Sequence, residues 1–128
     1  MLNKERLLHL AEILESDASN PTGIKFDLAI WGVGAGEMDC GTKGCAVGLA
    51  CLHPDFKAQG LRMGRSEPMF DGYQGWEAVD EFFGTDHLQS TLLFSDDSYA
   101  DAGLPTEGAE GERAVARRIR EMCAENPS

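Results

Sequence analysis

The sequence predicts a mainly α fold: a compact single domain, residues 1–128, with about five helices around a buried central helix and room for one small β-hairpin. The chain has 128 residues, which is the length of one domain. Hydrophobic residues make up 42% of it, too large a fraction for a disordered chain. Many of them recur at helical spacing, and neither a linker nor an internal repeat divides the chain.

A first helix is expected to begin after the N-cap residue Asn3 and to run to about Asp17. Three leucines share its buried face at the spacing i, i+3 and i+7: Leu7, Leu10 and Leu14. Turn-forming residues at 19–23 end this helix. The apolar residues 26–31 alternate only weakly, so we interpret them as a docking segment and not as a strand.

The central helix is expected from Lys43 to about Leu52, with Thr42 as its N-cap. Its residues are mostly apolar on every side, which is typical of a helix buried in a core. His53 and Pro54 end it, because the residue before a proline avoids the helical conformation.

Residues 57–75 are rich in glycine and are expected to form either a loop or a small hairpin. Two short helices follow: one at 76–83, which Gly84 ends, and one at 86–94, with Thr85 as its N-cap. Each is short enough to depend on packing for its stability.

After a loop at 95–104, a last helix is expected behind Pro105 and Thr106. Four apolar residues share its buried face: Val115, Ile119, Met122 and Cys123. This helix completes the five.

The negative charge of the chain is concentrated in its middle. The net charge is −11, and residues 66–112 contain twelve acidic residues without a single Lys or Arg. Such a chain does not attract phosphate backbones or anionic lipid, so neither nucleic acid nor a membrane is expected as a partner. The acidic residues form either a solvated face or a docking surface for a basic protein partner.

The sequence favours a cytoplasmic location. Charged residues interrupt the leucines of the first 15 residues, unlike the apolar core of a signal peptide. No stretch approaches the ~20 apolar residues of a membrane span.

Cys45 and His87 are the candidate catalytic residues. A helix that begins behind Thr42 would place Cys45 near its third residue, where unpaired backbone N–H groups and the helix dipole favour a thiolate. A nucleophile also needs a base within hydrogen-bond reach. His53 lies about 12 Å along the same helix, which leaves His87, or else His9, to be brought in by the fold. The simpler alternative is that Cys45 is a small core residue.

No metal ion or other cofactor is expected. Four potential zinc ligands lie close together in the sequence: Cys40, Cys45, Cys51 and His53. Cys45 and Cys51, however, are separated by about 240° around one helix and point away from each other. A disulfide between Cys40 and Cys45 is a further alternative, and in a reducing cytoplasm it would be regulatory or adventitious.

Several short motifs occur in a particular order along the chain. They are Phe26-Asp27-Leu28 followed by Trp31, then Cys40-Gly41-Thr42-Lys43-Gly44-Cys45, and later Phe83-Gly84 and Leu93-Phe94. This order resembles an uncharacterised family of small bacterial and phage-associated proteins, in which Met is usual at Leu28 and Trp is common at Leu49. The resemblance covers about residues 20–120 and implies a single compact domain, without a known activity or catalytic residues.

Together these observations predict a non-enzymatic cytoplasmic accessory or interaction domain whose acidic residues 66–112 form the partner surface. The alternative is a small cysteine-dependent hydrolase or transferase with Cys45 as its nucleophile and His87 as its base. In that case the backbone N–H groups behind Thr42 would hold the oxyanion.

Overall fold

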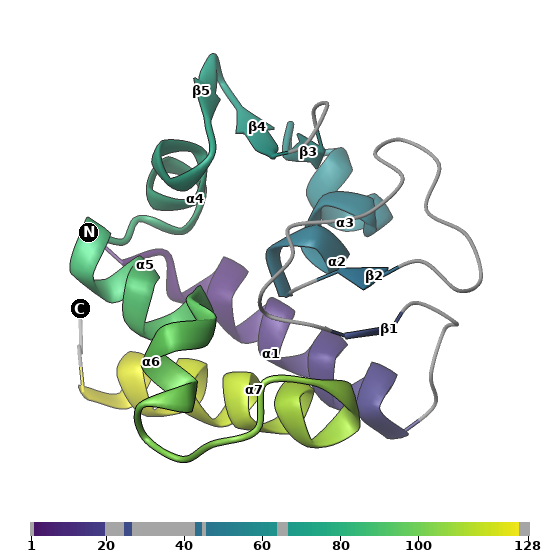
Figure 1. Ribbon diagram of the computed structural model, residues 1–128. Helices are drawn as coiled ribbons and strands as arrows, with labels where there is room; N and C mark the ends of the chain where they lie inside the picture. The colour runs from purple at the N-terminus through teal and green to yellow at the C-terminus, as the bar shows by residue number, and fades with distance from the viewer. Residues whose placement is uncertain (1, 20–24, 27–42, 45, 64–66, 126–128) are drawn as a thin grey trace.

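The structure is a computed structural model that describes residues 2–19, 25–26, 43–44, 46–63 and 67–125, and in this part of the chain it is mainly α-helical, as predicted (Figure 1). The helices are α1 (Lys4–Ser19), α2 (Ala46–Leu52), α3 (Pro54–Lys57), α4 (Trp76–Phe83), α5 (His87–Phe94), α6 (Asp96–Ala100) and α7 (Gly108–Glu125). The strands are β1 (Lys25–Phe26), β2 (Lys43–Gly44), β3 (Arg62–Met63), β4 (Pro68–Phe70) and β5 (Tyr73–Gln74). None of the described helices is long and apolar enough to cross a bilayer.

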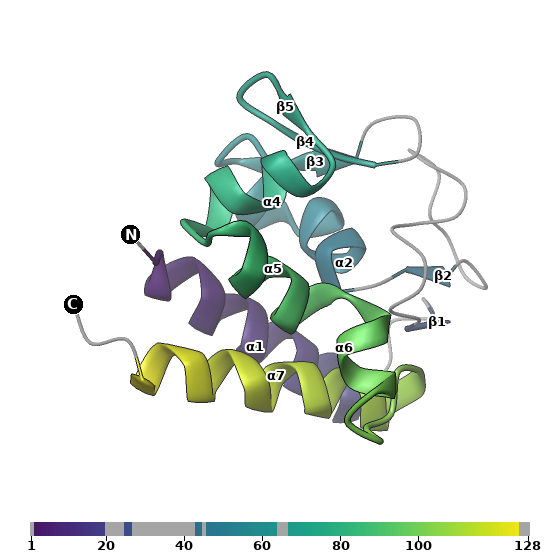
Figure 2. The ribbon, with the colours of Figure 1, turned by 60° about the vertical axis from the view of Figure 1, so that its left-hand side comes forward.

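Helices α1 and α7 lie side by side and run antiparallel (Figures 1 and 2). The side chain of Asn3 accepts a hydrogen bond from the backbone N–H of Arg6 at 3.1 Å and caps α1, as predicted. The leucines predicted for the inner face of α1 are fully buried, and so are Val115 and Ile119 of α7. Each fully buried side chain of this kind stabilises the fold by about 1.5–3 kcal/mol.

Helix α2 lies inside the fold, and the prediction of a buried central helix is confirmed. Phe56 of α3 is fully buried beside it and meets Phe82 and Phe83 of α4 edge to face, at ring-centroid distances of 5.4 and 6.3 Å. This arrangement suits the ring quadrupoles. The aromatic cluster connects the α2–α3 corner to the later helices.

The predicted start of the central helix is wrong. Helix α2 begins at Ala46, and Lys43 and Gly44 form strand β2, which pairs in parallel with β1. A pairing with distant residues therefore takes the place of the first helical turn predicted from local sequence. The predicted N-cap Thr42 and residues 27–31 of the predicted docking segment lie outside the described residues. Phe26, the first residue of that segment, is part of strand β1, where the prediction was no strand.

The glycine-rich segment forms a small antiparallel sheet in the order β3-β4-β5, so the hairpin alternative is confirmed. Asp71 and Gly72 join β4 to β5, and both have positive φ, 50° and 85°. An Asp-Gly pair with this geometry is typical of a tight type I′ hairpin turn.

Helix α4 ends as predicted, because Gly84 adopts the left-handed conformation at φ 67°. The predicted N-cap of α5 is wrong by one residue. Asp86 is the N-cap, and it forms a capping box with Gln89, whose backbone N–H donates to Asp86 at 2.7 Å. Thr85 is buried instead, with its hydroxyl 2.5 Å from that of Ser90.

The predicted loop at 95–104 contains helix α6. Tyr99 of this helix is fully buried, and its hydroxyl donates to the carbonyl of Leu93 at 2.7 Å. The guanidinium of Arg118 stacks over the Tyr99 ring at 4.1 Å. Contacts with α5 and α7 thus fix a short helix that the local sequence did not predict.

Candidate functional site

The predicted catalytic pair cannot be assembled from the described residues. Cys45 and Cys40 lie outside them, as does the predicted disulfide alternative. The premise for Cys45 as the third residue of a helix is wrong, because α2 begins only at Ala46. His87 is the first residue of α5, is exposed, and has its ring edge-on to Trp76 at a centroid distance of 6.2 Å. The pairing of Cys45 with His87 remains a prediction.

The two cysteines in the described part of the chain lie in the core. Cys51 is fully buried in α2, and Cys123 is buried in α7. Burial raises the pKa of the Cys123 thiol, although the nearby charges of Lys4 and Arg120 oppose the shift. A buried thiol with a raised pKa is a packing residue and not a nucleophile.

The acidic segment, which we define as residues 66–112, displays most of its charge at the surface. Eight of its twelve carboxylates are exposed: Asp71, Glu77, Glu81, Asp86, Asp97, Asp101, Glu107 and Glu110. Others have internal roles, since Asp80 accepts a short hydrogen bond from the hydroxyl of Ser90 and so ties α4 to α5. Three of the exposed carboxylates, Glu77, Glu81 and Asp97, lie on α4 and α6, and helices α4 to α6 contain no Lys or Arg.

Two leucines project from α5 into solvent. Leu88 and Leu92 are 69% and 43% exposed, while Leu93 and Phe94 of the same helix are buried. Residues four apart lie on the same side of a helix, so Leu88 and Leu92 form a ridge, which we call the α5 ridge. Helix α5 lies between α4 and α6 (Figure 2). The charged side chains of α4 and α6 are all acidic, whereas α7, which also packs against α5, contains arginines.

Arg118 reaches this region from α7, but its guanidinium is engaged. It donates to the carbonyl of Leu92 at 2.8 Å and to the hydroxyl and carbonyl of Ser98 at 3.1 and 3.2 Å. Its remaining face covers Tyr99. Arg118 therefore fixes the junction of α5 and α6.

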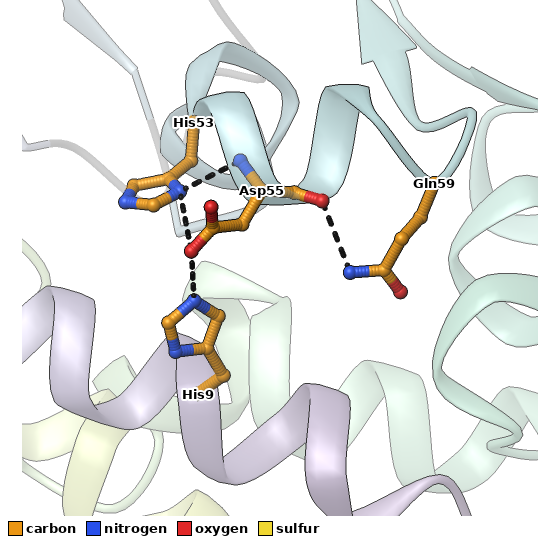
Figure 3. A network of polar contacts seen from close by, with 4 residues as sticks. All are labelled: His9, His53, Asp55 and Gln59. Carbon is orange, nitrogen blue, oxygen red and sulfur yellow. Dashed lines mark hydrogen bonds and ion pairs between the residues drawn. The ribbon is translucent and has the colours of Figure 1, made fainter.

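A second cluster of polar side chains lies where α1 meets the α2–α3 corner, and we call His9, His53 and Asp55 together the His9 corner (Figure 3). His9 Nε2 lies 2.8 Å from Asp55 Oδ2, and His53 Nδ1 lies 3.8 Å from the same oxygen. His53 is the N-cap of α3, and its Nδ1 accepts a hydrogen bond from the backbone N–H of Asp55 at 3.2 Å. Pro54 occupies the first helical position and has no backbone N–H to donate. The N–H of Asp55 is therefore the one that the His53 cap satisfies.

Phe56 forms an apolar floor beneath the His9 corner. Its buried ring lies 5.3 Å from the His9 ring and 6.0 Å from the His53 ring, and the two imidazoles meet edge to face at 5.5 Å. Gln59 donates to the carbonyl of Asp55 at 3.0 Å. The corner is thus built on the aromatic cluster of the core and is open on its other side.

Sequence reasoning assigned neither the α5 ridge nor the His9 corner. In the sequence, His9 is indicated only as an alternative base for Cys45, and His53 only as a potential zinc ligand beside the neighbouring cysteines. The contact between His9 and Asp55 spans 46 residues, so no local spacing reports it. The sequence His53-Pro54-Asp55 is the one local signal for the corner. At the start of a helix, the capping side chain lies close to the second helical residue, which here brings His53 next to Asp55.

Comparisons with models of protein families, with curated proteins and with solved structures found no match to this chain. The resemblance in the order of short motifs therefore remains a prediction. Function is inferred below from the residues of the chain itself.

Proposed function

We propose that this chain is a non-enzymatic interaction domain that docks a basic, amphipathic segment of a cytoplasmic protein on the α5 ridge and the acidic segment around it. The observation that carries the proposal is the exposure of Leu88 and Leu92, 69% and 43%, on a helix flanked by carboxylates. The buried thiol of Cys123 supports a reducing compartment such as the cytoplasm.

The α5 ridge supplies an apolar anchor of the kind that recognises helical segments. A partner helix with apolar residues at i, i+3 or i+4 packs such residues against two leucines one turn apart. Single exposed leucines are common on protein surfaces, but two on the same side of one helix form a continuous strip. We therefore assign the apolar part of the docking energy to Leu88 and Leu92.

The carboxylates around the ridge select the charge of the partner. Asp86 lies just before α5 and Asp97 lies in α6, and both are exposed. Lys or Arg side chains beside the apolar stripe of a partner would pair with them, while an acidic segment would be repelled. Arg118 adds one positive charge at the junction of α5 and α6, where its guanidinium donates to Ser98 and to the Leu92 carbonyl.

The test uses the full chain and a fluorescent synthetic helix with leucines along one side and lysines beside them. A scrambled peptide of the same composition is the matched probe. We expect the amphipathic peptide to bind at about 50 mM NaCl and to lose about tenfold in affinity at about 500 mM, because salt screens the exposed charges. The variant L88S/L92S should lose about tenfold in affinity at low salt as well.

Leu104→Ser is the control, since Leu104 is 37% exposed but lies outside α5. It should bind the peptide as the unmodified chain does. Equal binding of the scrambled peptide, or unchanged binding by L88S/L92S, would overturn the proposal.

A further inference from the structure

The His9 corner brings together three atoms that bind transition metals. One ligand atom from each of His9, His53 and Asp55 lies within 4.8 Å of the other two. A tetrahedral zinc ion holds nitrogen and oxygen ligands at about 2.0–2.2 Å, which separates neighbouring ligand atoms by about 3.3 Å. The two measured separations from Asp55 Oδ2, 2.8 and 3.8 Å, lie on either side of this value. Small side-chain rotations are therefore sufficient to bring the atoms into coordination.

The hydrogen bonds at the corner orient the two imidazoles for a metal ion. His53 Nδ1 accepts from the Asp55 backbone N–H, so its lone pair is on the nitrogen that faces the carboxylate. That hydrogen bond is long, 3.2 Å, and an ion would compete with it for the lone pair. His9 Nε2 faces the Asp55 carboxylate at 2.8 Å, and an ion would take the place of the proton between them.

The surroundings favour a cation and leave it accessible. The side chains of His9 and His53 are 35% and 31% exposed, and Asp55 is 59% exposed. Glu5 and Glu12 line the same shallow hollow of about 640 Å³ as His9 and Asp55, which leaves room for water ligands.

Arg6, one turn before His9 on α1, is engaged in contacts with neighbouring groups. The guanidinium of Arg6 donates to Gln59 at 2.7 Å and to the Phe82 carbonyl at 2.8 Å. It also lies 4.0 Å from the centre of the Phe82 ring. Arg6 is thus bound to Gln59 and to the aromatic cluster, and it lines a small cavity together with His9.

We propose that His9 Nε2, His53 Nδ1 and Asp55 Oδ2 bind one Zn²⁺ ion and so connect α1 to the α2–α3 corner. Two imidazoles and one carboxylate form a donor set that suits zinc and other late first-row divalent ions better than Mg²⁺ or Ca²⁺, which prefer oxygen ligands. Three protein ligands leave at least one position for water or a small anion. The site is independent of the α5 ridge, so either proposal can fail alone.

The test is calorimetric titration of the metal-free full chain with Zn²⁺ at neutral pH. We expect one ion per chain and a rise in melting temperature, because an ion that binds the folded state stabilises it. The variants H9Q, H53N and D55N should each lower the Zn²⁺ affinity by at least about tenfold. Asn at position 53 keeps the N-cap of α3, and Gln at position 9 keeps a helix-forming residue, so both variants should remain folded.

His87→Gln is the matched control, because His87 is the third histidine of the chain and lies on α5. It should bind Zn²⁺ like the unmodified chain. Co²⁺ supplies a second readout: absorption in the visible range without the near-ultraviolet band of a thiolate ligand would indicate nitrogen and oxygen donors. The proposal would be overturned if Zn²⁺ did not bind stoichiometrically or if the Co²⁺ spectrum contained a thiolate band. It would also be overturned if H9Q and H53N bound Zn²⁺ as tightly as the unmodified chain.

Discussion

Helices α1 and α7 pack against each other along an interface that we call the seam. Two polar contacts of the seam differ in their exposure to water. At the edge of the seam, Arg120 donates to both carboxylate oxygens of Glu15 at 2.9 and 2.7 Å, and the two side chains are 45% and 43% exposed. Inside the seam, Asp17 and Glu112 are only 5% and 3% exposed, and their carboxyl groups share a hydrogen bond. The edge keeps two opposite charges in water, whereas the interior brings two acids together away from it.

The two contacts respond to pH in opposite directions. The hydrogen bond from Arg120 lowers the pKa of Glu15, burial opposes this shift, and the charge of Arg120 adds a lesser lowering effect. Burial, together with the hydrogen bond and the charge of Asp17, raises the pKa of Glu112 to about 9, although the charge of Arg113 opposes the shift. Protonated Glu112 can donate to Asp17, which explains how two acids pack side by side in this seam.

The largest effect is expected from the apolar interior of the seam. Leu14→Ala should lower the free energy of unfolding by about 2–5 kcal/mol, because Leu14 is fully buried and its removal leaves a cavity. Leu8→Ala, on the half-buried side of α1, is the matched control and should cost less than half as much. Urea unfolding of both variants measures the difference. Equal losses of unfolding free energy in the two variants would show that the buried face of α1 does not contribute more to stability than its half-buried side.

Glu112→Gln should change how stability depends on pH. In the folded chain Glu112 keeps a proton up to a pH of about 9, whereas in the unfolded chain it loses the proton near its ordinary pKa. Its contribution is therefore fully present below that ordinary pKa and is lost as pH rises toward 9, by at most about 1.4 kcal/mol per pH unit. E112Q removes this loss, so it should be more stable than the unmodified chain at pH 8 and similar at pH 5.

Urea unfolding at pH 5, 6.5 and 8 measures this slope. Glu110→Gln is the control, because Glu110 is exposed on the same helix and should leave the slope unchanged. Parallel pH curves for E112Q and E110Q would contradict the protonated carboxyl pair.

The sequence predicts the two buried faces that meet in the seam, but neither their pairing nor these polar contacts. Leu7, Leu10 and Leu14 lie at helical spacing, and so do Val115 and Ile119, so the inner faces of both helices are readable from local pattern. The facing of Asp17 and Glu112 depends on how the two helices are placed against each other. Helical spacing gives the face of one helix and carries no information on its neighbour.

The His9 corner and α6 were missed for the same reason. His9 meets Asp55 across 46 residues, and α6 is fixed by the contact of Tyr99 with Arg118 from α7. The N-cap of α1 and the Asp-Gly turn after β4, by contrast, are formed by residues that are adjacent in the chain. Local contacts of this kind are the part of the structure that the sequence predicts.

The smallest effect is expected at the edge of the seam. Glu15→Gln should lower the free energy of unfolding by about 0.2–1 kcal/mol at neutral pH and low salt, because the pair that it removes is exposed. The lowered pKa of Glu15 means that its contribution is present above the ordinary pKa of the group and is lost as pH falls. The loss caused by E15Q should therefore shrink in high salt and in acid, whereas E112Q should gain stability over the unmodified chain as the pH rises.

Glu121→Gln is the control for Glu15→Gln, since Glu121 is exposed beside Arg120 on α7 and no described ion pair includes it. Urea unfolding in low and high salt, at neutral and acidic pH, separates the two variants. The double variant E15Q/E112Q then tests the comparison as a whole: the two substitutions remove slopes of opposite sign, so its stability should depend on pH less than that of E15Q alone. A pH dependence of the double variant as steep as that of E15Q would show that Glu112 is not the group that loses its proton as the pH rises.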